Sequence, residues 1–429
     1  MAQILSARRP ALALAVRRRR IVITGLGVVS PCGLNPQEVW DAVVNGRATC
    51  GPVTRFDSKD MPCHLAAEIK GFQPELWMEK KRAHRSDRAV RYCVAAGKQA
   101  FRDSGLEAEK VNGDRMAIYE GTTVAGLQNT LTQYSNLVND GVKAVQPTYV
   151  VSAFCGAGSS ELAMDLGING QATTICTGCS AGNDAIGYGM RQIWDDLADV
   201  VLAGGAEAPI VDGFYSVFAN LKVMSRWTGD PAKAMKPFDL ERDGFILGEG
   251  AAFLVLEELS HALARGARIY CELLAHGQAC DAYNMVALHP GGRGTIQAME
   301  RALLAGEVSS RSIDWINAHG SATSENDVIE AMAIRSVFGR DTDRIAVSAT
   351  KPVTGHLVGA TAAIEALICA LAIQNGCIPP TANLENPDPA CKLDLVRGSA
   401  REYPVRNVMN LNAGFGGKAS AIVLGTFTG

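Results

Sequence analysis

Short apolar runs alternate along the chain with longer stretches in which apolar residues recur at helical spacing. The runs are apolar throughout rather than at every second position, which is typical of strands buried on both faces of a sheet. They lie at 21–30, 115–119, 199–205 and 251–256. Amphipathic helices are predicted between them, one after Asn35-Pro36 and one over 82–104. This alternation predicts an α/β fold, in which the polar segment 128–149 runs over the surface or forms a subunit interface.

Two strings from the first half of the chain return in the second half. Thr177-Gly-Cys-Ser-Ala-Gly182 is matched by Thr354-Gly-His-Leu-Val-Gly359, and the glycine-led strand at 248–256 is matched by the one at 416–424. The two pairs keep the same order, at offsets of 177 and 168 residues. This predicts a duplicated α/β unit, with an N-terminal half at 21–262 and a C-terminal half at 263–429. If the halves pack about a pseudo-two-fold axis, Cys179 and His356 face a common cleft.

Composition narrows the class of protein. The chain has 429 residues, of which 47% are hydrophobic, enough for one large core or two fused smaller ones. The net charge is −3 and the charges are interspersed, so we expect no nucleic-acid partner. No apolar run approaches the ~18 residues of a membrane span, and none is predicted. The 12 cysteines are scattered and no secretory signal is evident, which indicates reduced thiols in the cytoplasm.

The first 20 residues differ from the rest because they carry six arginines and no acid. They resemble an organelle presequence, which would place the protein in an organelle matrix, but a disordered leader or an over-extended start fits equally. We therefore leave residues 1–20 out of the predicted fold.

Cys179 is the first candidate for chemistry. It lies where a short β-type run breaks at glycine and a helix follows, and unpaired N–H groups at a helix start favour a thiolate over a thiol. The alternative is that Cys179 has no chemical role and is a small cysteine packed under a tight turn. Cys176 and Cys179 also form a C-x-x-C pair, but a zinc site needs a second such pair, and Cys176 closes an apolar strand where we expect it to be buried.

Three further polar sites lie in apolar surroundings. His319 follows a strand, Lys351 ends another strand, and Gly414-Phe-Gly-Gly417 forms a flexible turn before the last strand. His319 and His356 each lie beside glycine, where the backbone approaches a ligand closely, whereas the other five histidines are interpreted as structural. The pair Gly25-x-Gly27 gives little support to a dinucleotide site, because the third glycine position holds Ser30.

Together these strings resemble the motif blocks of β-ketoacyl-carrier-protein synthases, which are thiolase-fold condensing enzymes. The blocks are Thr177-Gly-Cys-Ser-Ala181, Asn317-Ala-His-Gly-Ser-Ala-Thr323, Lys351 with Thr354-Gly-His-Leu357, and Gly414-Phe-Gly-Gly417. The resemblance runs from about Arg20 to the C-terminus. Details such as Ala382-Asn-Leu-Glu-Asn-Pro-Asp-Pro389 look more like the ketosynthase subunit of type II polyketide synthases than the fatty-acid enzyme. Lys418, Ala419 and Ala413 depart from the usual family residues and bear on the shape of the acyl pocket.

The resemblance implies a fold and a set of residue roles. The fold is a thiolase-like αβαβα arrangement of five layers, built from two duplicated halves. Cys179 is the nucleophile that accepts the acyl group, and His319 and His356 donate hydrogen bonds to the enolate that decarboxylation produces. The backbone N–H groups of Cys179 and Phe415 form the oxyanion hole. The remaining roles are Lys351 as the charge supporting the histidines, Phe415 as the gate, Ser321 and Thr323 as pantetheine-binding residues, and Asp327 and Glu330 as supporting acids.

The resemblance also implies partners and leaves rival functions. Substrates arrive on the phosphopantetheine of an acyl carrier protein, no metal or organic cofactor is required, and the second subunit is either a copy or a chain-length-factor-like chain. The predicted reaction is decarboxylative Claisen condensation in type II polyketide biosynthesis, with fatty-acid elongation as the alternative. A non-condensing structural subunit would lack Cys179. A degradative thiolase would need a second reactive cysteine, for which Cys391 is a poor substitute.

Overall fold

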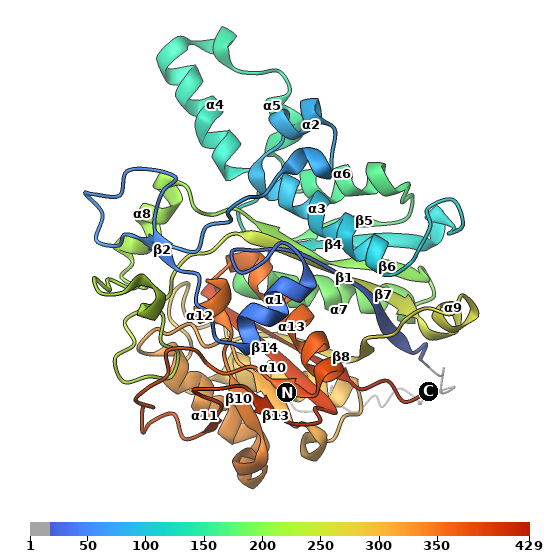
Figure 1. Ribbon diagram of the computed structural model, residues 1–429, viewed down its shortest axis with the longest axis vertical. Coiled ribbons are helices and arrows are strands. Elements are labelled where there is room, and N and C mark those ends of the chain that lie inside the picture. The colour runs from blue at the N-terminus through green and yellow to red at the C-terminus, as the bar shows by residue number, and fades with distance from the viewer. Residues whose placement is uncertain (1–17) are drawn as a thin grey trace, which may run out of the picture.

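The computed structural model describes residues 18–429, and its strands fall into two sets with the same topology (Figure 1). The N-terminal set consists of β1 (Ile21–Val29), β4 (Met116–Gly121), β5 (Ala172–Ile175), β6 (Val200–Glu207) and β7 (Gly250–Glu258). The C-terminal set consists of β8 (Cys271–Cys280), β9 (Trp315–Asn317), β10 (Ala346–Ser348), β14 (Asn407–Gly414) and β15 (Lys418–Gly425). In space they run β5-β4-β6-β7-β1 and β10-β9-β14-β15-β8.

This shared order confirms the predicted duplication. Numbered within its own half, each set has its third, second, fourth, fifth and first strands side by side. The second strand pairs in parallel with the third and fourth, and the fourth and fifth pair antiparallel. The first strand is antiparallel to the fifth in both halves. The two halves are therefore built on one strand order and one set of strand directions.

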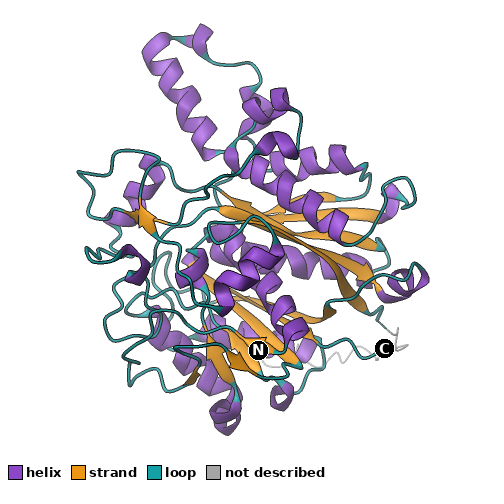
Figure 2. Ribbon diagram, in the orientation of Figure 1, coloured by secondary structure: helices purple, strands orange, loops and turns teal. Residues whose placement is uncertain are grey.

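The helices form three layers around the two sets of strands (Figure 2). Helices α3 (Arg88–Asp103) and α6 (Ala157–Leu166) cover the outer face of the N-terminal set. Helices α7 (Ala181–Trp194) and α13 (Thr361–Asn375) lie between the two sets and contact both. Helices α10 (Arg293–Ala305) and α11 (Asn326–Phe338) cover the far side. The order αβαβα is therefore the predicted five-layer arrangement.

The two sets of strands are joined rather than separate. β1 pairs with β8 at Val22 and Ile23, so the strands form one continuous 11-stranded sheet that ends in β12 (Asp394–Leu395). The prediction of one sheet per half missed this junction. Its physical reason is that the first strand of each half lies at an edge, where unpaired N–H and C=O groups find each other.

Shorter elements complete the fold. The other helices are α1 (Pro36–Val44), α2 (Lys80–Arg85), α4 (Leu127–Asp140), α5 (Tyr149–Ala153), α8 (Asp212–Asn220), α9 (Leu259–Ala264) and α12 (Lys351–Thr354). Two small ladders pair β2 (Gly51–Pro52) with β3 (Leu65–Ala66), and β11 (Cys377–Ile378) with β13 (Arg401–Glu402). The single helix predicted over 82–104 is broken, because Asp87 caps α3 by accepting a hydrogen bond from the N–H of Ala89.

The predicted leader falls mainly on residues 1–17, which lie outside the described residues. Arg19 and Arg20 are described and packed. Arg19 pairs with Asp199 at 2.5 Å, and Arg20 makes two hydrogen bonds of 2.9 Å to the carboxylate of Glu272. These contacts attach the chain to the residue before β6 and to β8 before the first strand begins.

The central helix α13 is strongly apolar. The stretch Val358–Asn375 is 18 residues long and apolar enough by length and composition to cross a membrane, which the sequence reading overlooked. In the fold 83% of this stretch is buried inside the protein, as the core helix between the two sets of strands.

The glycines of β1 serve packing. A Cβ atom at Gly25 would lie 2.2 Å from the carbonyl oxygen of Ala100, and one at Gly27 would lie 2.0 Å from that of Ala96. Helix α3 therefore packs directly on the backbone of β1, which accounts for this Gly-x-Gly pair without a bound nucleotide.

We predict that Gly27→Ala lowers the free energy of unfolding by about 3 kcal/mol, because α3 has to move away from β1 to admit the methyl group. Gly51→Ala is the matched control, since a Cβ at Gly51 meets nothing within 4 Å. Urea unfolding followed by tryptophan fluorescence measures both variants. Equal stability of the two variants would contradict this role for Gly27.

Candidate active site

The two matched motifs place Cys179 and His356 at the starts of the two central helices. Each lies in or just before a short 3₁₀ turn, Gly178–Ser180 before α7 and Val358–Ala360 before α13. Cys179 Sγ lies 3.3 Å from His356 Nε2. The sequence prediction that these two side chains share a cleft matches this geometry.

His319 joins them from the loop after β9. Its ring centroid lies 5.5 Å from that of His356, with the ring planes 82° apart. Glu330 on α11 fixes the loop, because its carboxylate accepts hydrogen bonds from the N–H groups of His319 at 2.6 Å and Gly320 at 2.8 Å. Asp327, one turn earlier, accepts from the N–H of Ala322 at 3.1 Å. Both acids are buried and hold the histidine loop.

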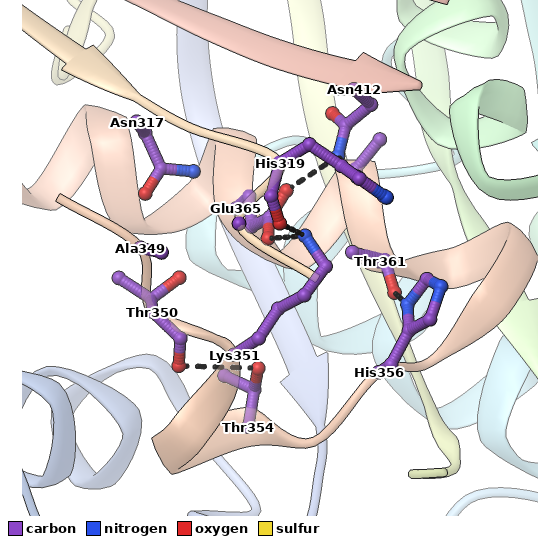
Figure 3. Close-up of polar contacts among 12 residues, drawn as sticks. Asn317, His319, Ala349, Thr350, Lys351, Thr354, His356, Thr361, Glu365 and Asn412 are labelled. Carbon is purple, nitrogen blue, oxygen red and sulfur yellow. Dashed lines mark hydrogen bonds and ion pairs between the residues drawn. The ribbon is translucent and has the colours of Figure 1, made fainter. Parts of the chain in front are cut away.

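Lys351 lies beneath the histidines and is completely buried (Figure 3). Its Nζ donates hydrogen bonds to the backbone carbonyl oxygen of His319 and to Glu365 Oε1, the latter at 2.7 Å. Asn412 Nδ2 donates to Glu365 Oε2 at 2.7 Å and lies 3.5 Å from His319 Nδ1. The ammonium thus contacts the histidine loop through its backbone and reaches the imidazole through Glu365 and Asn412.

Burial and charge keep both imidazoles neutral. The pKa values of His319 and His356 lie well below 6.5, first because both rings are buried and second because the Lys351 ammonium disfavours a nearby positive charge. The Thr361 hydroxyl lies 2.9 Å from His356 Nδ1. Two neutral rings therefore face the thiol of Cys179.

The electrostatics of Cys179 differ from the prediction. Its thiol is partly accessible to the cleft, yet burial raises its pKa to about 12, against a smaller lowering by Lys351. The helix start does not produce a resting thiolate, because the cost of a charge in this apolar setting exceeds what the backbone dipoles return. The predicted lowering of this pKa is wrong, and Cys179 rests as a neutral thiol.

These residues open into a pocket of ≈ 250 Å³. Cys179, His319 and His356 lie on its wall together with the predicted Ser321, Thr323 and Phe415. Ser321 Oγ and Thr323 Oγ1 are 3.0 Å apart, and the Phe415 ring stacks on Phe218 with centroids 5.8 Å apart. Gly414 brings the Phe415 turn so close that a Cβ there would lie 3.0 Å from the nitrogen of Cys179.

Comparison with protein-family models identifies this arrangement. Residues 18–262 match the model described as Beta-ketoacyl synthase, N-terminal domain, and residues 270–385 match Beta-ketoacyl synthase, C-terminal domain. The chain belongs to the β-ketoacyl synthase family. It is therefore an acyltransferase of the condensing class.

Individual relatives agree with the family. A 3-oxoacyl-[acyl-carrier-protein] synthase 2 from Synechocystis sp. is 39% identical over 94% of this chain and 97% of its own length, and one from Coxiella burnetii is 38% identical over 95% and 99%. Among solved structures, the ishigamide ketosynthase/chain length factor has a TM-score of 0.89 and 36% identity, covering 96% of this chain and 100% of that one. A type II PKS acyl-carrier protein in complex with its ketosynthase has a TM-score of 0.89, 29% identity and the same coverage.

This β-ketoacyl synthase has polar residues around its site that the sequence reading missed. Thr361, Glu365 and Asn412 contact the histidines or Lys351 directly. Behind them, side-chain amides link α7 to the C-terminal strands through Asn183, Asn317, Asn410 and Asn412. A signal was present, because Glu365 interrupts an apolar helix and Asn410 and Asn412 interrupt an apolar strand.

The synthase does not bury Cys176. This residue is exposed, contrary to prediction, because β5 is the edge strand of the sheet and its end is uncovered.

Across residues 18–429, no group of three or more His, Cys, Asp or Glu side chains is arranged to hold a metal ion.

We predict that Lys351→Met lowers the free energy of unfolding by about 3–5 kcal/mol, since it leaves Glu365 as an uncompensated buried charge. Adding Glu365→Gln should recover part of that loss in a double-mutant cycle measured by urea unfolding. Lys236→Met is the matched control. Lys236 Nζ lies 2.8 Å from the carboxylate of Glu241, which is exposed to solvent. The expected loss is therefore about 0–1 kcal/mol. Strictly additive effects of the two buried substitutions would count against the pairing.

We predict that alkylation of Cys179 by iodoacetamide accelerates about tenfold per pH unit from pH 6 to 9. A thiol with its pKa raised to about 12 gains thiolate throughout that range. Peptide mass mapping follows Cys179, with the exposed Cys280 in the same sample as a reference for reagent access. A rate that levels off below pH 8 would show a preformed thiolate instead.

Proposed function

We propose that this β-ketoacyl synthase joins an acyl group held on Cys179 to a malonyl unit on an acyl carrier protein by decarboxylative Claisen condensation. The observation that carries the proposal is the convergence of one thiol and two neutral imidazoles on a single pocket. A thiol accepts an acyl group, and neutral imidazole N–H groups stabilise an enolate without protonating it readily.

The first half-reaction is acyl transfer. Cys179 Sγ attacks the thioester carbonyl of an acyl carrier protein, the bond to the pantetheine sulfur breaks, and the cysteine proton leaves with that thiol. His356 Nε2, 3.3 Å from Sγ, is placed to pass the proton. The N–H groups of Cys179 and Phe415 would bind the oxyanion, each worth about 3 kcal/mol in such sites.

The second half-reaction is decarboxylation and carbon–carbon bond formation. Malonyl thioester loses carbon dioxide, the resulting enolate carbon attacks the acyl carbonyl on Cys179, and the thiolate departs. Asn412 supports the required tautomer of His319, because its Nδ2, fixed as a donor by Glu365, faces Nδ1 and leaves the ring proton on Nε2. The Thr361 hydroxyl can either accept from or donate to His356 Nδ1, so this ring can hold its proton on Nδ1 while Nε2 takes the cysteine proton, and on Nε2 when it donates to the enolate.

Other site residues have roles that follow from their positions. Ser321 and Thr323 present hydroxyl groups to the pocket, where they would bind the amides of pantetheine. Phe415, stacked on Phe218, would gate the boundary between the malonyl and acyl sites. Lys351 holds the histidine loop and keeps the imidazoles uncharged, while Asp327 and Glu330 hold the loop backbone.

We propose that the enzyme acts in type II polyketide biosynthesis. The structural likeness to the ishigamide ketosynthase/chain length factor supports this, at 36% identity and a TM-score of 0.89. Fatty-acid elongation is the second candidate, and the 39% identity to a 3-oxoacyl-[acyl-carrier-protein] synthase 2 favours it.

The second subunit would cover the apolar surface around α4 and α5, which project from the body of the molecule (Figure 1). Side chains there are strongly exposed: Tyr134 64%, Val138 62%, Val142 76%, Val150 74%, Val151 62% and Phe154 50%. Such a patch is too apolar for open solvent. We propose that a thiolase-fold subunit packs on it, either a copy of this chain or a chain-length-factor-like partner.

The acylation test uses intact mass. Mixed with a medium-chain acyl carrier protein, the protein should gain the acyl mass, and Cys179→Ala should gain none. Cys176→Ala is the matched control and should be acylated normally, since Cys176 lies outside the pocket lining.

If neither the unchanged protein nor Cys176→Ala is modified, the experiment is repeated with the co-expressed partner subunit. Failure there as well would refute Cys179 as the acyl acceptor.

Primer selectivity separates the two pathways. We predict extension of 3-oxoacyl and 2-enoyl carrier-protein primers within about tenfold of the saturated primer of equal length, because a polyketide chain keeps such groups between condensations. Product masses after single-turnover reactions with malonyl carrier protein measure this. Extension of the saturated primer alone would assign the enzyme to fatty-acid elongation.

A further inference from the structure

The turn that carries Cys179 is tied to the helix that follows it. The Thr177 hydroxyl, two residues before the nucleophile, donates a hydrogen bond of 2.5 Å to Asp184 Oδ2 in the first turn of α7. Ser180 closes the same turn, because its hydroxyl donates to the Thr177 carbonyl oxygen at 3.0 Å and lies 3.5 Å from Asp184 Oδ2. Asp184 therefore fixes both ends of the four-residue turn that contains Cys179.

Asp184 is itself held by the other half of the molecule. His276 on β8 is buried, and its Nε2 lies 3.1 Å from Asp184 Oδ1 and 3.2 Å from Ser420 Oγ on β15. The imidazole packs directly on α7, where a Cβ at Gly187 would lie 2.1 Å from the ring. His276 thus links the nucleophile turn to the C-terminal strands.

This buried histidine is not explained by packing alone. Among the described residues its Nδ1 has no hydrogen-bond partner, which is costly for a buried polar atom. A hydrophobic side chain would fill the same space without that cost. The contact of Nε2 with Asp184 explains why an imidazole occupies this position.

The pseudo-two-fold relation supports a role in positioning. Asp184 lies five residues after Cys179, and Thr361 lies five residues after His356, at the matching point of α13. Thr361 holds the ring of His356 through Nδ1. Counted from Cys179 and from His356, the same position therefore carries a side chain that holds the turn or the ring of its own half.

We propose that Asp184, Thr177 and His276 form a positioning network that keeps the Cys179 thiol in contact with His356. This inference deepens the proposed function, since it concerns the residue proposed to accept the acyl group. While the contacts of Asp184 with Thr177 and His276 are intact, the Sγ of the cysteine lies beside the Nε2 of its histidine and can lose its proton. Without them, the turn relaxes and the thiol loses its proton acceptor.

The test compares alkylation of two cysteines in one peptide. Iodoacetamide at pH 8 labels Cys179 and the exposed Cys176, and peptide mass mapping gives the ratio of the two rates. Thr177→Val and Asp184→Asn should lower the Cys179 to Cys176 ratio by at least fivefold. Thr177→Ser keeps the hydroxyl and should leave the ratio near that of the unchanged protein. His276→Phe should lower the ratio, and His276→Gln, which retains an N–H donor, should restore most of it.

Two controls make the result specific. Asp195→Asn lies at the other end of α7 and should leave the ratio unchanged. Cys369 is fully buried, so its labelling reports unfolding, and a variant labelled there is set aside. Thr177→Val then decides the outcome, because Thr177 is partly exposed. An unchanged or increased ratio in Thr177→Val would overturn the proposal.

The readout needs no carrier protein, so it stands apart from the proposed function. If Cys179 never accepts an acyl group but the ratio falls as expected, the positioning network survives and the condensing role of Cys179 fails. If acylation proceeds normally in Thr177→Val while the ratio is unchanged, the positioning network fails and the proposed role of Cys179 survives.

Discussion

The close approach of α7 and α13 is the constraint on which the site depends. Cys179 and His356 lie just before these two helices, and the 3.3 Å between Sγ and Nε2 depends on the helices meeting at small residues. A Cβ at Gly182 on α7 would lie 2.5 Å from the backbone nitrogen and 3.2 Å from the Cα of Ala363 on α13. Larger side chains here would separate the helix starts and with them the thiol and the imidazole.

A second requirement is that the site holds one fixed positive charge without charging its histidines. Lys351 meets it from below, where Glu365 and the carbonyl of His319 satisfy the ammonium. The same charge lowers the pKa values of both rings and favours, weakly, ionisation of Cys179. Burial raises the cysteine pKa by more than Lys351 lowers it, so the thiol and both imidazoles are uncharged at rest.

Much of this arrangement was accessible from the sequence, for identifiable reasons. The motifs around Cys179 and His356 are bounded by glycine and recur at nearly constant spacing, so the duplication and the shared cleft followed from pattern alone. Glu365 and Asn412 were missed because one polar residue within an apolar helix or strand has no partner until the fold supplies it. The pKa of Cys179 and the exposure of Cys176 depend on burial and on an edge strand, which no local pattern encodes. The junction of β1 with β8 is a matter of register between distant strands.

The matched positions of Cys179 and His356 carry a consequence for ancestry. A single unit of this fold has one such helix start, so two identical units paired about a two-fold axis would place the same residue at both points. A cysteine facing a histidine requires the two copies to differ. Joining the copies in one chain allows that difference, because each position then mutates independently. The presence of both halves in one chain is thus what allows a cysteine to face a histidine on a symmetric scaffold.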